Sequence, residues 1–237
     1  MLTLLRRSVS LTISDLKVSF KRSESLLITA AMPIIALIAL SFTDGGLHKY
    51  LPFIFVQSSM ASALLSLGIT TGFDRRYRVL VRLGTTPIGK SGIVISKILY
   101  VFIFETIQLF LIGTVGIALG FRPSITILLA LPFCWLASIS FASIALIISS
   151  KLKAETNLGV QNLTYIVLLA ISSISFLSKT NDGEAIMLLR LVPSSALHSL
   201  LRYATNLNDF SLTAFLSLIL FGIGLTLVAI RAFKFDE

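Results

Sequence analysis

The first residues that could do chemistry are Gly84-Thr-Thr-Pro-Ile-Gly89-Lys90-Ser91, which match the phosphate-binding pattern G-x-x-x-x-G-K-[ST]. A phosphate loop of this kind joins a buried strand to a helix whose N-terminus faces the phosphates, and Mg²⁺ needs a further acidic residue from a neighbouring strand. Here an Arg-rich run precedes Gly84 and a long apolar stretch follows Ser91. We therefore expect no nucleotide site and no cofactor in this chain.

Glu105 is the second candidate, because a carboxylate in the middle of an apolar stretch is costly to bury. It must face protein or water, and Gln108 lies on the same helical face one turn further on. Lys97, two turns earlier, is expected to snorkel toward the cytoplasmic surface. Glu105 either lines a pathway or clamps two helices together. Its candidate partners lie in two other apolar stretches: Gln57, Ser58, Ser59, Gln161 and Asn162.

No other residues have the spacing of an active site or a metal site. His48 and His198 are far apart in the sequence, and Cys134 is the sole cysteine, which excludes an intrachain disulfide. A serine protease would need a Ser and a His inside the bundle, and a metal-dependent transferase would need clustered carboxylates. We therefore expect a protein that is not an enzyme.

Six long apolar stretches must position these residues. Each has about the 17–25 residues that a helix needs to cross a hydrocarbon core about 30 Å thick. Backbone groups in lipid must be satisfied within the segment, which selects helices. The chain is 55% hydrophobic and 13% charged. We predict an all-α membrane protein with six transmembrane helices: Ser25–Phe42, Leu51–Gly72, Ile93–Leu119, Ile125–Ser150, Leu158–Leu177 and Ser211–Ile230.

Lysine and arginine residues are sorted between the two sides of these helices. Fourteen lie on the side of both termini and five on the other, and Lys97 inside the third helix completes the total of 20. The positive-inside rule places the richer side, with both termini, in the cytoplasm, and the chain in the cell (inner or plasma) membrane. The net charge of +9 then faces anionic membrane lipid, so nucleic acid is not an expected partner.

Residues 1–24 are predicted to form an amphipathic helix that lies in the membrane interface. Its basic and polar residues occupy other faces than its apolar residues, which is the pattern of a helix with one side in lipid. The alternative is an amphipathic helix docked on a partner protein. The apolar residues recur at helical spacing: Leu5, Val9, Ile13, Leu16 and Phe20.

The loop Phe73–Gly92 carries five basic residues and one acidic residue. The segment Asp74–Leu83 contains no Gly or Pro, so we predict one short helix there. Gly84 can end this helix, and Pro87 prevents its continuation. The alternative is a solvated positive-inside loop. The predicted helix has one partly apolar side: Tyr77, Leu80 and Val81.

The outer segment Ser178–Phe210 reads as two short amphipathic helices broken at Pro193, with Ser194 or Ser195 capping the second. We predict a re-entrant hairpin that dips into the outer leaflet or closes the mouth of a pathway. The alternative is a loop packed on the bundle for stability alone. A seventh crossing is not expected here, because the segment contains two charged residues and a proline: Arg190, Arg202 and Pro193. Leu197, Leu200 and Leu201 share one face of the second helix, which also carries His198.

Two G-x-x-x-G pairs, Gly68/Gly72 and Gly116/Gly120, are predicted to allow close packing of helices.

The order of these parts resembles the membrane subunit of an ABC transporter of the type-2 permease family, in particular its drug-exporting, antibiotic-resistance branch. The resemblance covers nearly the whole chain. The first stretch that carries it is similar to the family's loop of charged residues, followed by L-x-x-x-P and a Lys that enters the third span. The three stretches are FDRRYRVLVRLGTTPIGKSGIVISKIL (Phe73–Leu99), LKAETNLGVQN (Leu152–Asn162) and LVPSSALHSLLR (Leu191–Arg202).

The resemblance implies a permease that exports a hydrophobic or amphipathic substrate and forms a dimer with a second permease chain, identical or a sister. A separate ABC ATP-binding subunit would dock on the cytoplasmic side and hydrolyse Mg-ATP. The short helix after Phe73 would be the coupling helix in a groove of that subunit. The coupling residues would be Asp74, Arg75, Arg76, Tyr77, Arg78, Arg82 and Gly84.

An ATP-independent secondary carrier or channel is the alternative function, with Glu105 as a proton relay. The sequence shows no clear inverted repeat with broken helices, which argues against it. We expect a single permease domain, residues 1–237: an interfacial helix (1–24), spans one and two (25–72), a cytoplasmic coupling loop (73–92), spans three to five (93–177), the outer hairpin (178–210), and span six with a cytoplasmic tail (211–237).

Overall fold

The structure is a computed structural model that describes residues 2–21, 23–43, 46–86, 88–177, 188–189 and 191–233. All regular structure within these ranges is helical, and they contain no strand. The chain is thus an all-α, multi-pass membrane protein, as predicted. Five of its helical segments are long and apolar enough to cross a membrane: Leu47–Arg76, Gly89–Ala118, Ile125–Ser149, Ala154–Ile174 and Leu212–Ala232.

The first predicted span, Ser25–Phe42, coincides with helix α2 (Ser23–Ser41). Its described apolar stretch, Ala31–Ser41, is shorter than the roughly 20 residues that a crossing needs. Helix α2 packs against α3 and α6 of the bundle. The sixth crossing therefore stays a prediction.

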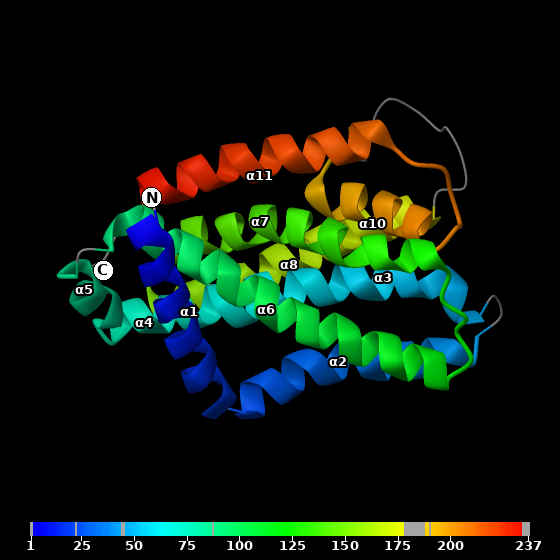
Figure 1. The fold of residues 1–237 in the computed structure, drawn as a ribbon, viewed down its shortest axis with the longest axis horizontal. Helices are drawn as coiled ribbons and strands as arrows, with labels where there is room; N and C mark the ends of the chain where they lie inside the picture. The colour runs from blue at the N-terminus through cyan, green and yellow to red at the C-terminus, as the bar shows by residue number, and fades with distance from the viewer. Residues whose placement is uncertain are drawn as a thin grey trace.

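The long helices run side by side along the bundle, and α1 lies across them at one end (Figure 1). The other elements are α1 (Leu2–Lys21), α3 (Gly46–Met60), the π-helix η1 (Ala61–Gly68), α4 (Ile69–Arg76), α5 (Val79–Gly84), α6 (Gly89–Ala118), the 3₁₀-helix η2 (Ile125–Leu129), α7 (Ala130–Ser149), α8 (Ala154–Leu177), α10 (Pro193–Ala204) and α11 (Leu212–Ala232).

The two ends of the bundle differ in charge. We call the end formed by α1, α4, α5, the start of α6, the α7–α8 connection and the end of α11 the basic end; it lies on the left in Figure 1. Besides the buried Lys97, its described cations include Arg6, Arg7, Lys17, Arg75, Arg76, Arg78, Arg82, Lys90, Lys151, Lys153 and Arg231. The opposite end holds Lys49, Arg122 and Arg202. The fold thus gathers the cations as the sequence pattern requires.

Helix α3, η1 and α4 form one continuous segment at the centre of the bundle. Within its most apolar 18 residues 72% are buried, against 22% for α8 and 28% for α11. The segment contacts α2, α6, α7, α8 and α10. A π-helix inside a long helix widens the turn and is frequent at functional sites. Here it occupies the most enclosed part of the protein, with seven of its eight residues buried.

Helix α1 has a buried polar face and an exposed apolar face. Ser8 and Thr12 are buried against α6, where their hydroxyls donate to the Gly92 and Ser96 carbonyls, each at 3.0 Å. Val9 and Ile13 are 46% and 47% exposed. A polar stripe therefore holds α1 to the protein and leaves apolar side chains outward, as an interfacial helix requires. The side chains of Leu5 and Phe20 lie outside the described residues.

Gly120 caps the C-terminus of α6. The predicted packing role of the pair Gly116/Gly120 is therefore wrong for Gly120. Gly120 has φ +95°, a backbone conformation that favours glycine, and no atom of another helix lies within 4 Å of the place that a Cβ would take. The Gly120 and Phe121 amides donate to the Ile117 and Gly116 carbonyls at 3.0 and 2.9 Å, which is the Schellman arrangement. Gly116 itself faces the Phe121 side chain.

Helix α10 packs into the bundle near the opposite end, between α11, α7, α8 and α3. Leu197, Leu200 and Leu201 are buried together on one face, as predicted. The predicted serine cap is wrong. Val192 is the N-cap and Pro193 occupies the first turn, where a missing N–H costs nothing. The serines that follow, Ser194 and Ser195, are buried. Most of the predicted first half of the hairpin, residues 178–187 and Arg190, lies outside the described residues.

Candidate functional site

The predicted coupling loop contains two helices, so the prediction of one helix over Asp74–Leu83 is wrong. Helix α4 continues the central segment to Arg76, and α5 begins at Val79. Arg78 between them has φ 56° and breaks the regular hydrogen bonding. Helix α5 ends at Gly84, as predicted, whereas Pro87 lies outside the described residues.

Because of this break, the three residues of the predicted partly apolar side do not lie on one face. Leu80 is fully buried and anchors α5 to the bundle. Tyr77 is 63% exposed and Val81 37% exposed, so they do not share its environment. Arg78 and Arg82 are also exposed. The segment Tyr77–Arg82, which includes most of α5, therefore presents cationic, aromatic and aliphatic side chains outward at the basic end.

Lys97 joins three helices at this end. Its Nζ lies 3.0 Å from Asp15 Oδ2 of α1 and 3.1 Å from Asp74 Oδ2 of α4. The Lys97 side chain is 5% exposed, and the two carboxylates are 22% and 27% exposed. Lys97 therefore does not snorkel to the surface as expected, because two anions reach it inside the protein. We call these three residues the Lys97 cluster.

Two arginines of α4 bind the α7–α8 connection. Arg75 is buried, and its guanidinium donates to the Ser149 carbonyl and, at 3.2 Å, to the Leu152 carbonyl. Arg76 forms an exposed ion pair with Glu155 at the start of α8. The first half of the predicted coupling residues is thus occupied within the chain, and only the second half faces outward.

Helix α8 crosses the junction of η1 and α4 where two of its side-chain amides lie on glycines. Gln161 covers Gly68 and Asn157 covers Gly72, with the same four-residue spacing on each helix. The Gly68 carbonyl accepts from Asn157 Nδ2 at 2.9 Å and from Ser149 Oγ at 2.7 Å. The predicted packing role of Gly68/Gly72 is confirmed at this crossing. We call Gly68, Gly72, Ser149, Asn157 and Gln161 the amide cluster.

Glu105 is fully buried in the middle of α6. Ser138 Oγ of α7 donates to its Oε2 at 2.8 Å, and Ser59, whose hydroxyl donates to the Phe55 carbonyl, also faces the carboxylate. Glu105 Oε1 accepts no hydrogen bond from any described residue. Since a buried acceptor without a donor is costly, this oxygen is a candidate point for a proton or a ligand.

The other polar candidates are distributed over the bundle. Gln108 Oε1 accepts from Ser62 Oγ of the π-helix at 3.1 Å. Gln57 contacts Tyr165 of α8, and Asn162 donates to the Leu158 carbonyl of its own helix at 2.9 Å. Gln161 belongs to the amide cluster. The expectation that Gln161 or Asn162 pairs with Glu105 is therefore wrong.

His198 of α10 is buried, and its pKa is lowered to about 4 by that burial and by the nearby Arg202 charge. Arg202 reaches away to Asn208 Oδ1 at 3.1 Å. In the part of the chain that the structure describes, no three metal-ligating side chains come together. His198 is thus a neutral, packed histidine at neutral pH.

The residues before and after the phosphate-loop pattern are helical. Helix α5 ends at its first glycine, Gly84, and α6 begins at its second, Gly89. A phosphate loop needs a strand before its first glycine to aim backbone amides at the phosphate. In the described residues before Gly84 the structure has helix α5 at this place and no strand. The geometry therefore offers no context for nucleotide binding here.

The sequence pointed to Lys97, Glu105 and Gln161 but not to most of the residues that bind them. Asp15, Ser138, Ser149 and Asn157 each complete a cluster, yet each is a common polar residue without a motif around it. The comparisons with protein-family models and with curated proteins give no match to this chain, so the fold and these clusters are the basis for assigning a function.

Proposed function

We propose that this chain is the membrane-spanning permease subunit of an ATP-driven ABC exporter. It would work as a dimer with a second permease chain, in the cell membrane, with both termini cytoplasmic and α10 as part of a re-entrant hairpin on the outer side. A separate ATP-binding subunit would bind and hydrolyse Mg-ATP. The apolar interior suits a hydrophobic or amphipathic substrate.

The observation that carries the proposal is the exposed helix α5 at the basic end. It directly follows α4 in the chain and is anchored to the bundle by the buried Leu80. Its outward Arg78 and Arg82 give it the charge to enter an acidic groove of a partner. The preceding helix α4 is fastened to α1 and α6 through the Lys97 cluster. A push on α5 would therefore reach a spanning helix and the interfacial helix together.

Coupling requires that the partner contact α5 differently in its ATP-bound and ATP-free states, since equal contact would shift nothing. Arg78→Glu should reverse the charge offered to the partner without touching the ion pairs of α4. Gly84→Pro should disrupt the end of α5. Both changes should uncouple ATP hydrolysis from transport, whereas Lys153→Glu, an exposed change on the α7–α8 connection, should not.

The direct test is to reconstitute the purified chain in vesicles with and without an ATPase subunit that carries a true phosphate loop, beginning with one encoded beside it. The expected result is export that needs both proteins and Mg-ATP, with substrate-stimulated hydrolysis lost in Arg78→Glu. Unchanged export and hydrolysis in that variant would refute the role of α5. Transport by the pure chain alone would refute the whole proposal.

The observation that favours the alternative, an ATP-independent carrier or channel, is the buried Glu105 with one carboxylate oxygen that accepts no described hydrogen bond. A proton relay needs a group of this kind inside the membrane. Glu105→Gln separates the two functions. It should abolish gradient-driven transport by the pure chain if the protein is a proton-coupled carrier, and it should leave ATP-driven export largely intact if Glu105 only clamps α6 to α7.

A further inference from the structure

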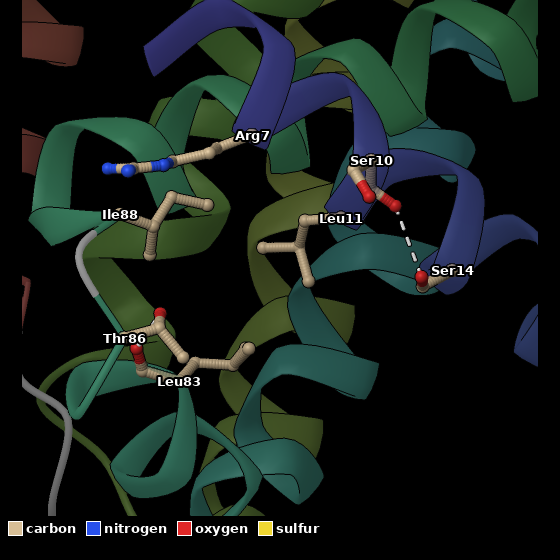
Figure 2. A pocket seen from close by; sticks show the side chains of 7 residues that line it. All are labelled: Arg7, Ser10, Leu11, Ser14, Leu83, Thr86 and Ile88. Atoms are coloured by element: carbon tan, nitrogen blue, oxygen red, sulfur yellow. Dashed lines mark hydrogen bonds between the residues drawn. The ribbon is translucent and has the colours of Figure 1, made fainter. Parts of the chain in front are cut away.

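An open groove lies between α1 and the turn that joins α5 to α6 (Figure 2). Its volume is about 290 Å³. One side comes from a single face of α1, at spacings of three, four and seven residues: Arg7, Ser10, Leu11 and Ser14. The other side is Leu83, Thr86 and Ile88. This face of α1 is different from the one that holds α6 and from the one that carries Val9 and Ile13.

The lining of the groove is divided by polarity. Leu11, Leu83 and Ile88 are half-buried or buried and form an apolar floor, and Leu11 points toward Leu83 and Thr86 in Figure 2. Arg7 extends across the groove over Ile88, with Ser10 one turn along α1. The guanidinium has five N–H donors in a planar fork that matches a phosphate. The groove thus offers a cation and a hydroxyl above an aliphatic surface.

We propose that this groove binds the phosphate and upper acyl chains of an anionic phospholipid from the cytoplasmic leaflet. Helix α1 lies across the bundle with Val9 and Ile13 outward, so its neighbouring face would sit at headgroup depth. The basic end carries most of the described cations, which complements an anionic leaflet. A volume near 290 Å³ accepts a glycerophosphate head and the first methylenes, not a whole lipid.

This inference depends on the membrane placement in the proposed function but not on ATP coupling. It is tested on the purified full-length chain without an ATPase subunit. Phosphatidylglycerol and phosphatidylcholine with short acyl chains are titrated separately in detergent, and the bound lipid is counted by native mass spectrometry. Failure of lipid binding would leave the transport proposal standing, and failure of transport would leave a lipid site standing.

Arg7→Ala and Arg6→Ala form the matched pair, because both remove one exposed cation from α1 and only Arg7 lines the groove. Arg7→Ala should weaken phosphatidylglycerol binding about fivefold, the effect of one surface cation on an anionic lipid. Arg6→Ala should change it less than twofold, and phosphatidylcholine should bind weakly to all forms. Ser10→Asp adds a negative charge to the groove and should weaken phosphatidylglycerol binding as Arg7→Ala does. It replaces Arg7→Ala in the test if Arg7→Ala does not fold.

Equal losses in Arg6→Ala and Arg7→Ala would mean diffuse attraction to the basic end, and the site would be overturned. Equal binding of the two lipids by the unaltered chain would overturn it as well. A third outcome would assign the groove to a protein partner: unchanged lipid binding in Arg7→Ala and Ser10→Asp, together with loss of co-purification of the ATP-binding subunit when each variant is separately co-expressed with it. That outcome would also refute the lipid site.

Discussion

The basic end and the opposite end of the bundle are held together by different forces. At the basic end, charged groups join the helices: Lys97 binds two carboxylates, and Arg75 binds two carbonyls. At the opposite end, α10 is held by buried leucines such as Leu197 and Leu200. Ion pairs are directional and can exchange partners, whereas a close-packed apolar core resists gradual deformation.

This difference separates the part of the protein suited to move from the part suited to stay. The basic end contains the break at Arg78 and the exposed α5, while the opposite end contains a Schellman-capped turn and a buried short helix. If an ATPase drives this protein, the charged end is the one that can be rearranged. The following changes attack one end or the other.

Removing Lys97 should have the largest effect. Lys97→Met leaves Asp15 and Asp74 without their cation, and breaking a buried ion pair from one side costs about 3–5 kcal/mol. We expect a lower free energy of unfolding in detergent and release of α1 from α6. Disulfide crosslinking between cysteines placed at Thr12 and Ser96, which lie against each other where α1 meets α6, would report that release.

Lys153→Met is the control for this change, because Lys153 is an exposed lysine at the same end. It should leave stability within about 0.5 kcal/mol of the unaltered protein. If Lys97→Met proved equally harmless, α1 would be held by the Ser8 and Thr12 hydrogen bonds alone. The charged-end comparison would then be wrong.

Acid should act on the opposite end through His198. Its folded pKa is about 4 and its unfolded pKa near 6.5, so the unfolded state binds the proton first as pH falls. Stability is full above pH 6.5 and declines between pH 6.5 and 4, by at most roughly 3 kcal/mol. Thermal unfolding at a series of pH values measures this slope.

His198→Gln should flatten that slope, since no proton is then gained on unfolding at this position. Arg202→Met should reduce it only partly, because burial is the larger cause of the shift and the Arg202 charge the smaller. A slope that persists unchanged in His198→Gln would show that acid acts elsewhere in the protein.

Adding a methyl group at Gly68 should test the crossing of α4 and α8. A Cβ there would lie 2.5 Å from Gln161 Nε2, which is itself hydrogen-bonded to the Ala145 carbonyl at 2.9 Å. Gly68→Ala should therefore cost about 1–3 kcal/mol. Gly159→Ala in α8, where nothing lies within 4 Å, should instead stabilise by about 0.5–1 kcal/mol. The opposite signs of two identical substitutions are the measurement.

Breaking the Arg76–Glu155 ion pair should have the smallest effect. The two side chains are 48% and 66% exposed, and exposed pairs contribute about 0–1 kcal/mol. A double-mutant cycle with Arg76→Met and Glu155→Gln should give a coupling energy below about 0.5 kcal/mol, and less in high salt. A much larger coupling would mean that this pair, and not the amide cluster, holds α4 to α8.

The spans and the charge asymmetry could be predicted because they depend on composition alone. Runs of apolar residues identify the five long segments, and the distribution of Lys and Arg identifies the two ends. The buried face of α10 was also readable, since Leu197, Leu200 and Leu201 follow helical spacing. These features require no knowledge of which helix packs on which.

The clusters could not be predicted because each joins residues far apart in the chain. Asp15 meets Lys97 only once α1 lies across α6, and Ser138 meets Glu105 only once α7 lies beside it. The left-handed residue at Arg78 carries no local signal, since glycine would be the usual choice there. The π-helix is equally hidden, because a segment with seven of its eight residues buried shows no single apolar face in its sequence.

The π-helix lets the two halves of the central segment point their side chains toward different neighbours. Above it, α3 meets α2 and α10; below it, α4 meets α8 and α5. Each residue of an α-helix advances the side chains by about 100° around the axis. If the same residues, Ala61–Gly68, wound as an ordinary α-helix, α4 would be turned further around the axis and the two halves would be out of phase, with Asp74 and Arg75 rotated away from Lys97 and Ser149. The wider winding thus acts as a phase correction that lets one helix serve two sets of neighbours.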